Sequence, residues 1–332
     1  MPKPMRKILL ILACACTLCA CHRNNPTEHH EGDIAILRAD QLFFGTPASQ
    51  LPQALAQARP TYQCAVFSIP VDDPNFTSMV TEYTQSPDMR MLYDTVQAHF
   101  ASLTWLEREL TPAVQRLQKA YKDNPQAPLE CKKVIAYLNG SFDYRQRTFA
   151  SEGSLLISLD QYVLPYMEKY GFCGQPMYIV NQSDSIFLLT DCLTALAQQV
   201  IPVGEMKQML DFMVAEGKTL YMLDIACPKM DDRLKMRYTE EQMEWMKKNE
   251  QNVWAYLVQH KLLFESDQTK YHNFIDDAPK TNAFGEASAP RTAQYIGWQM
   301  VRQYARKTGC SLQELLNETN ANTILNKSGY RP

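Results

Sequence analysis

The sequence predicts an α+β fold, with a small antiparallel or mixed sheet in the first half and a mainly helical second half. Three observations support this prediction. Short runs of β-branched and other apolar residues occur between residues 34 and 159. From Asp160 onward, apolar residues instead recur at helical spacing. The composition, 45% hydrophobic and 21% charged, is that of an ordinary globular protein.

The predicted strands are short. Ile34–Arg38 is the first, and Lys133–Leu138 is a second that ends at Asn139-Gly140, a strong turn signal. Thr148–Ala150 and Leu155–Leu159 are its expected partner strands.

Two helices are predicted before or between these strands, over Met79–Tyr93 and Leu103–Tyr121. Pro112 lies inside the second and is expected to kink or restart it. Two capping boxes, Ser311 with Glu314 and Thr239 with Gln242, mark later helix starts. The helices predicted for the second half are Asp184–Val200, Glu205–Ala226, Thr239–His260, Asp267–Ile275, Arg291–Lys307, Ser311–Thr319 and Ala321–Asn326.

The first 21 residues have the pattern of a bacterial lipoprotein signal. A basic start is followed by an apolar run, Ile8–Ala20, which is too short to span a bilayer. The run closes with Leu18-Cys19-Ala20-Cys21, a lipobox in which Cys21 receives the lipid. The alternative is a plain secretory signal cut near Ala20. We therefore expect a signal peptide over 1–20, a lipidated cysteine and flexible tether over 21–32, and a single domain over 33–332.

Charge and composition restrict the partners. Removing the first 20 residues takes away three of the 33 basic residues and none of the 36 acidic ones, which leaves a net charge of −6. No basic stripe occurs in the remaining chain, so nucleic acid is not an expected partner. We expect the membrane, reached through the lipid, and an envelope protein as partners, and no cofactor. No acid occurs in His22–Asn25, which favours a periplasm-facing location.

Six cysteines lie beyond the signal: Cys64, Cys131, Cys173, Cys192, Cys227 and Cys310. An exported chain can form up to three disulfides from these, with the pairing undetermined, or can keep several as buried free thiols. These six contain no CxxC pair, so a thiolate zinc site is not expected. The sequence also contains no HExxH, GxSxG, Walker or GxGxxG motif, so no standard catalytic pattern is present.

Two predicted helical faces combine polar and aromatic residues. The first carries Glu216, Lys218, Tyr221 and Asp224 around Gly217, a glycine that can let another helix approach closely. The second is a stripe of residues at helical spacing. It consists of Arg291, Tyr295, Trp298 and Arg302. Such a stripe can line a binding groove by cation–π contact, or it can belong to a core helix whose arginines neutralise buried acids.

Motifs occur in four segments, Phe212–Pro228, Tyr238–Trp245, Ala289–Arg302 and Ser328–Pro332. Through these motifs much of the chain resembles the GldB-type gliding-motility lipoproteins of Bacteroidetes. Phe212–Pro228 is similar to that family's "GK-x-LY-x-x-D…P" segment, and Tyr238–Trp245 is similar to its "YTEEQ…W" block. Ala289–Arg302 resembles its "sPGR…wiGWQIV" helix, and Ser328–Pro332 resembles its terminus. The resemblance implies an envelope lipoprotein tied to gliding.

The helix pattern also looks like a zincin-like peptidase fold that has lost its metal site. In that comparison Asp184–Val200 takes the place of the HExxH helix and Glu216 the place of a distal ligand, while Asp191 cannot replace an imidazole. Our leading hypothesis is a non-enzymatic binding or scaffold lipoprotein. Its groove would lie between the helices that carry Glu216–Asp224 and Arg291–Arg302. The rival is a metal-dependent or degenerate peptidase that uses Asp191, Glu216 and Asp224, and a third possibility is a purely structural role.

Overall fold

Four short strands form one mixed sheet in the first half of the chain, as a computed structural model shows for residues 33–58, 73–121, 129–151, 153–202 and 206–332. The strands are β1 (Ile36–Arg38), β2 (Lys133–Tyr137), β3 (Thr148–Ser151) and β4 (Ser154–Ser158), in the order β1-β2-β4-β3. β2 runs parallel to both neighbours, and β3 and β4 form an antiparallel hairpin. The predicted α+β class and the mixed sheet are confirmed. The predicted signal peptide, Cys21, the tether and Cys64 lie outside the described residues.

The chain does not fold back into a hairpin at Asn139-Gly140, because both neighbours of β2 run parallel to it. The turn is held instead by the fully buried carboxylate of Asp160, which accepts hydrogen bonds from the backbone N–H groups of Asn139 and Gly140. Gly140 has a φ of 71°, a conformation that glycine adopts at no steric cost. Burial raises the pKa of Asp160, and these donors oppose that shift.

The first half contains one helix break that differs from the prediction. The helix expected over Met79–Tyr93 is two helices, because Ser86 before Pro87 is extended and Pro87 starts a new helix. Helix α5 continues through Pro112, so the predicted restart there is wrong. The helices are α1 (Ala39–Gly45), α2 (Leu51–Ala58), α3 (Phe76–Gln85), α4 (Pro87–Phe100) and α5 (Thr104–Tyr121).

The second half is mainly helical, and each helix predicted there is present with shifted ends. Both capping boxes form: the side chains of Thr239 and Ser311 accept hydrogen bonds from the backbones of Gln242 and Glu314. The single-turn helices α6 and α9 were not predicted. The helices are α6 (Met177–Asn181), α7 (Leu188–Gln198), α8 (Met209–Ala226), α9 (Asp232–Met236), α10 (Glu240–Gln259), α11 (Gln268–Ile275), α12 (Thr292–Thr308), α13 (Leu312–Asn317) and α14 (Ala321–Ser328).

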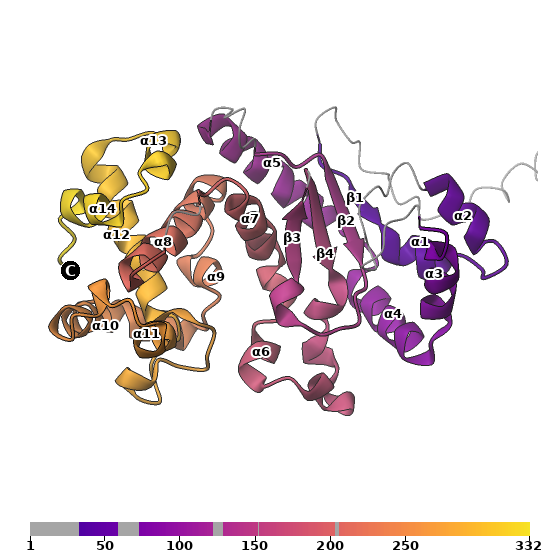
Figure 1. Cartoon of the computed structure of the whole chain (residues 1–332). Coiled ribbons are helices and arrows are strands. Elements are labelled where there is room, and N and C mark those ends of the chain that lie inside the picture. The colour runs from indigo at the N-terminus through magenta and orange to yellow at the C-terminus, as the bar shows by residue number, and fades with distance from the viewer. Residues whose placement is uncertain (1–32, 59–72, 122–128, 152, 203–205) are drawn as a thin grey trace, which may run out of the picture. The chain divides into compact units, whose positions relative to one another are not determined.

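Helices α7 and α8 connect the sheet to the helical half. α7 packs on β3 and β4, α1 packs on β2, and these two helices lie on opposite sides of the sheet (Figure 1). α8 in turn contacts α5, α7 and α12. Residues 34–332 make up one unit by their contacts. None of the helices in the described part of the chain is long and apolar enough to be a membrane span.

The cysteines among the described residues are free thiols that form no disulfide. Cys192 and Cys227 are buried thiols, and Cys131, Cys173 and Cys310 are half-buried. Burial raises the pKa of the Cys131 thiol to about 12, so this group is not a nucleophile at neutral pH.

Candidate functional site

Helices α8 and α12 touch through their backbones, so no groove runs between them where they cross. A Cβ on Gly217 would lie 2.5 Å from the carbonyl oxygen of Gly297, and a Cβ on Gly297 would lie 1.9 Å from that of Met213. Close approach of a second helix is therefore the reason for Gly217. The predicted groove between these helices is wrong at this crossing, because two backbones occupy its place.

A cavity of about 640 Å³ opens instead beside the crossing, and three of the predicted site residues line it: Asp191, Glu216 and Arg291. They come from α7, from α8 and from the residue that precedes α12. A smaller cavity of about 240 Å³ adjoins it. The residues that line both cavities are Tyr144, Arg145, Asp191, Thr194, Arg237 and Asp277.

Asp191 is held by two partners. Its Oδ1 lies 3.0 Å from a terminal nitrogen of Arg237, and its Oδ2 accepts a hydrogen bond of 2.7 Å from the hydroxyl of Tyr162. Tyr162 is fully buried, and burial together with the Asp191 charge raises the pKa of its phenol well above the usual value. Tyr162 therefore stays a neutral hydrogen-bond donor, and Asp191 stays fixed on the cavity wall.

Arg291 and Asp277 form the second ion pair, with 3.2 Å between them. Arg291 also donates to the backbone carbonyl of Met236, the last residue of α9. Burial raises the pKa of Asp277, but the charges of Arg291, Arg237 and Arg147 lower it by more, so that the pKa lies below the ordinary value. This carboxylate is ionised at neutral pH.

Arg237 and Arg291 share an unusual backbone conformation. Their φ angles are 54° and 49°, in the left-handed region that residues with a Cβ seldom adopt. Each side chain crosses to a backbone carbonyl on another element, Arg237 to Gln182 and Arg291 to Met236. The two guanidinium groups are thereby fixed in place. Strained residues that the surroundings hold in place are common at functional sites.

Arg147 lines the smaller cavity and has no carboxylate within ion-pair distance among the described residues. Only 3% of the residue is exposed. Its Nη2 donates to the Ser183 hydroxyl and, at 3.5 Å, to the Ile179 carbonyl, while Nε is buried without a partner. Burial, followed by the charge of Arg237, lowers the pKa of Arg147 to about 10.

Glu216 is the acidic residue in the cavity wall with a raised pKa. Burial raises the pKa and the Asp277 charge adds to the shift, while the Arg291 charge opposes it. A carboxyl group of this kind can exchange a proton closer to neutral pH than an exposed one.

Two of the remaining predicted residues, Asp224 and Trp298, belong to a separate network. The Trp298 indole donates to Asp224 at 2.9 Å, and Arg302 binds Asp224 through two nitrogens, each at 2.7 Å. Arg302 also pairs with Asp232 and lies 3.6 Å above the Trp298 ring. Lys235 completes the cluster by contacting both aspartates. Every charge here has an opposite partner, so the network stabilises the core.

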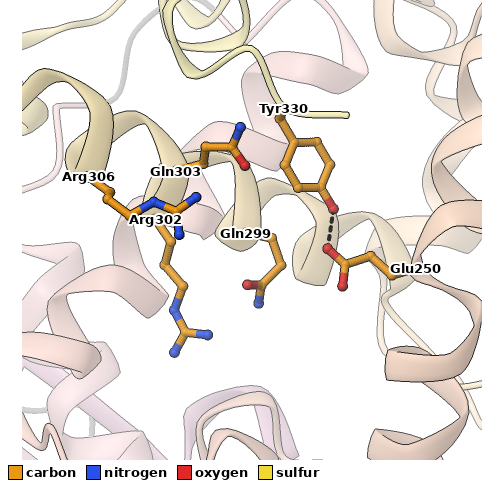
Figure 2. Close-up of a pocket in the computed structure, with 6 residues that line it drawn as sticks. All are labelled: Glu250, Gln299, Arg302, Gln303, Arg306 and Tyr330. Atoms are coloured by element: carbon orange, nitrogen blue, oxygen red, sulfur yellow. Dashed lines mark hydrogen bonds between the residues drawn. The ribbon is translucent and has the colours of Figure 1, made fainter. Parts of the chain in front are cut away.

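A third cavity, of about 220 Å³, lies between α12, Glu250 of α10 and Tyr330 near the end of the chain (Figure 2). Arg302, Gln299, Gln303 and Arg306 reach it from this helix, and the Tyr330 hydroxyl donates to Glu250 across from them. Arg302 is already bound by two aspartates. Of the two arginines in this wall, Arg302 is therefore already neutralised, and Arg306 has no ion pair among the described residues.

The last predicted residues face neither of the joined cavities. Tyr295 is buried next to Trp298, and Tyr221 is half-buried against the core. The ammonium group of Lys218 donates to the carbonyls of Leu316 and Glu318 at the end of α13. Lys218 thus caps α13.

The amine of Lys218 is expected to titrate unusually low. Burial lowers its pKa to about 8, against about 10.4 in an unfolded chain. Between these values the unfolded state holds a proton that the folded state has lost, so this group makes the fold more stable as pH rises through that window. A carbon NMR titration of labelled lysine side chains should show one midpoint near 8. A midpoint above 10 for Lys218 would refute this burial argument.

The side chains do not fit a zinc ion as the peptidase comparison would require. Asp191 is bound by Arg237 and Tyr162, and Asp224 is bound by Arg302 and Lys235 in a separate network. Within the described ranges, no three His, Cys, Asp or Glu side chains come together as a metal site. Zinc is held mostly by imidazole and thiolate ligands, and neither lines these cavities.

Sequence patterns did not single out Arg147, Arg237 or Asp277, which complete the cavity walls. The positions of Arg237 and Asp277 held a weak signal, whereas that of Arg147 held none. Arg237 directly precedes the Tyr238–Trp245 block, and Asp277 lies within the stretch from Phe274 to Pro279. A charged residue directly beside the Tyr238–Trp245 block, such as Arg237, could have been added to the candidates.

Comparison with known proteins finds a family match that covers nearly the whole chain. The family model described as gliding motility protein GldB matches residues 21–332. No curated protein matches. No solved structure matches either, so the zincin-like resemblance stays a prediction.

Proposed function

Because the chain belongs to the gliding motility protein GldB family, we propose that it is a non-enzymatic binding lipoprotein of the gliding or envelope machinery. In this proposal a lipid on Cys21 anchors the chain, the domain faces the periplasm, and an envelope partner or ligand occupies the joined cavities beside Arg147. The supporting observation is the buried Arg147 guanidinium, which lines an open cavity without a carboxylate partner among the described residues.

The chemistry of the cavity walls supports recognition. Two of the carboxylates, Asp191 and Asp277, are paired with arginines, and backbone carbonyls hold those arginines in place. A group fixed in this way presents charge and hydrogen bonds in a constant geometry, which favours binding of a complementary group. General base catalysis needs an acceptor that gains and loses a proton near neutral pH, and a carboxylate with a depressed pKa is poorly suited to that task.

Filling the cavity is expected to abolish function. Thr194 on α7 lines both cavities and is half-buried, so Thr194→Trp puts an indole into the binding space. The test is complementation of a strain from which the gene for this protein is deleted. The Thr194→Trp variant should accumulate normally but should fail to restore the gliding or envelope phenotype that the deletion removes. The matched control is Thr95→Trp, at a half-buried threonine on α4 away from these cavities, which should restore it. Full function of Thr194→Trp would contradict the proposal.

A second function, a degenerate peptidase, is favoured by Glu216 alone, because its pKa is raised at the cavity wall. A hydrolase that used this carboxyl group would need it as an acid or base. The peptidase proposal therefore predicts that Glu216→Gln is inactive, whereas the binding proposal predicts that this nearly isosteric variant is active.

A further inference from the structure

The terminal nitrogens of Arg147 differ in their surroundings. Nη2 donates to Ser183, whereas Nη1 has no hydrogen-bond partner in the described part of the chain and is not among its fully buried polar atoms. Only 3% of the surface of Arg147 is exposed, and the residue lines the smaller cavity. Nη1 therefore keeps some exposed surface and is free to donate, and the smaller cavity is one that Arg147 lines. An unpaired buried charge is costly, which favours an anion beside it.

The charges around the smaller cavity leave a surplus of one. Three arginines line it, Arg145, Arg147 and Arg237, against two aspartates, Asp191 and Asp277. Outside the wall of the smaller cavity, Asp143 pairs with Arg145 and Arg291 pairs with Asp277. The negative charge of Asp143 and the positive charge of Arg291 therefore cancel each other. A single negative charge would neutralise the surplus, whereas a phosphate dianion would be repelled by the two aspartates.

The adjoining larger cavity has a mixed wall, in which Glu216, Asp276 and Lys235 are charged and four residues are apolar. Phe212, Leu220, Met236 and Ile275 contribute to its wall, and the last three are almost fully buried. Thr148 and Thr194 add hydroxyl groups in the smaller cavity. A planar carboxylate matches the forked donors of an arginine, and an apolar body matches the apolar part of the larger cavity.

We propose that this site binds a monocarboxylate, with the carboxylate on Arg147 in the smaller cavity and an apolar body in the larger one. The proposal rests on the proposed binding function and names its ligand class. The carboxylate can belong to a free organic acid or to the C-terminus of a polypeptide, since both present the same group.

The test is a calorimetric titration of the full-length protein in a neutral detergent at pH 7 with 4-methylpentanoate and, separately, with its uncharged amide. We expect one saturable site for the acid and binding of the amide at least about tenfold weaker, as loss of a charge-assisted hydrogen bond implies. Equal binding of acid and amide, or binding of neither, would overturn the inference.

Arg147→Gln locates the site. It should weaken binding of the acid at least about tenfold, while Arg90→Gln, at an arginine that donates to the Phe44 carbonyl away from both cavities, should leave it within about twofold. Unchanged affinity in Arg147→Gln would place the acid elsewhere and overturn the inference. If Arg147→Gln does not fold, Thr194→Trp replaces it, with the same loss expected.

The source of the carboxylate is decided by N-acetyl-leucine. Binding at least tenfold tighter than 4-methylpentanoate would assign a polypeptide C-terminus, and equal or weaker binding would assign a free acid. The two proposals fail separately. If Thr194→Trp abolishes function in cells while acid and amide bind alike, the binding function stands and the carboxylate is excluded.

Discussion

Gly297→Ala is expected to destabilise the fold by more than about 3 kcal/mol. The added methyl group would lie 1.9 Å from the carbonyl oxygen of Met213, well inside the contact distance of real atoms. The obstacle is backbone on a long helix, so α8 and α12 must move apart. Because α8 also contacts α5 and α7, that movement would disturb the packing between the helical half and the sheet.

Urea unfolding at pH 7 measures this loss, and Gly45→Ala is the control. Gly45 ends α1, and a Cβ there would make an ordinary 3.6 Å contact with the Tyr93 hydroxyl. The control should change the free energy of unfolding by less than about 1 kcal/mol, since alanine is the better helix former. A loss in Gly297→Ala as small as the control's would show that the helices do not touch there.

Arg302→Gln is the second large effect, with an expected loss of about 3 kcal/mol, at the lower end of the range for a broken buried pair. The substitution leaves Asp224 and Asp232 with Lys235 as their remaining cation and removes the group that lies over Trp298. The lower end applies because the Arg302 side chain keeps 27% of its surface exposed. Lys248→Gln, at an exposed ion pair, should lose less than about 0.5 kcal/mol.

Unfolding at pH 3 and pH 7 distinguishes charge loss from packing loss. Burial raises the pKa of Asp232, but Arg302 and Lys235 lower it by more, so it lies below the ordinary value. Such a carboxylate stabilises the fold above its unfolded pKa of about 3.9, and this contribution disappears as pH falls through the lower folded pKa. The difference between wild type and Arg302→Gln should therefore shrink at pH 3. A constant difference would contradict the ion-pair account.

Local sequence signals predicted the elements well, and the reasons are physical. Capping boxes at Thr239 and Ser311 fix where helices start, because their side chains satisfy free backbone donors at that point. The apolar runs at Lys133–Leu138 and Leu155–Leu159 became β2 and β4 because short apolar runs of this length suit the buried strands of a sheet.

The site was less predictable because it depends on contacts between distant residues. Asp191, Glu216 and Arg291 were identified individually, but the groove proposed between α8 and α12 ignored the second glycine, Gly297, which brings the backbones together. Arg147 could not be recognised from sequence. Arg147 stands out because it lacks a carboxylate partner, and the residues around it are known only from the folded structure.

The central claim is that the joined cavities recognise a ligand and do not cleave one. Complementation of the deletion strain by two variants at equal expression tests it most directly. The account predicts that Glu216→Gln restores function and that Thr194→Trp, which fills the space next to the same wall, does not. An inactive Glu216→Gln variant that folds and accumulates like wild type would contradict the account and favour the peptidase.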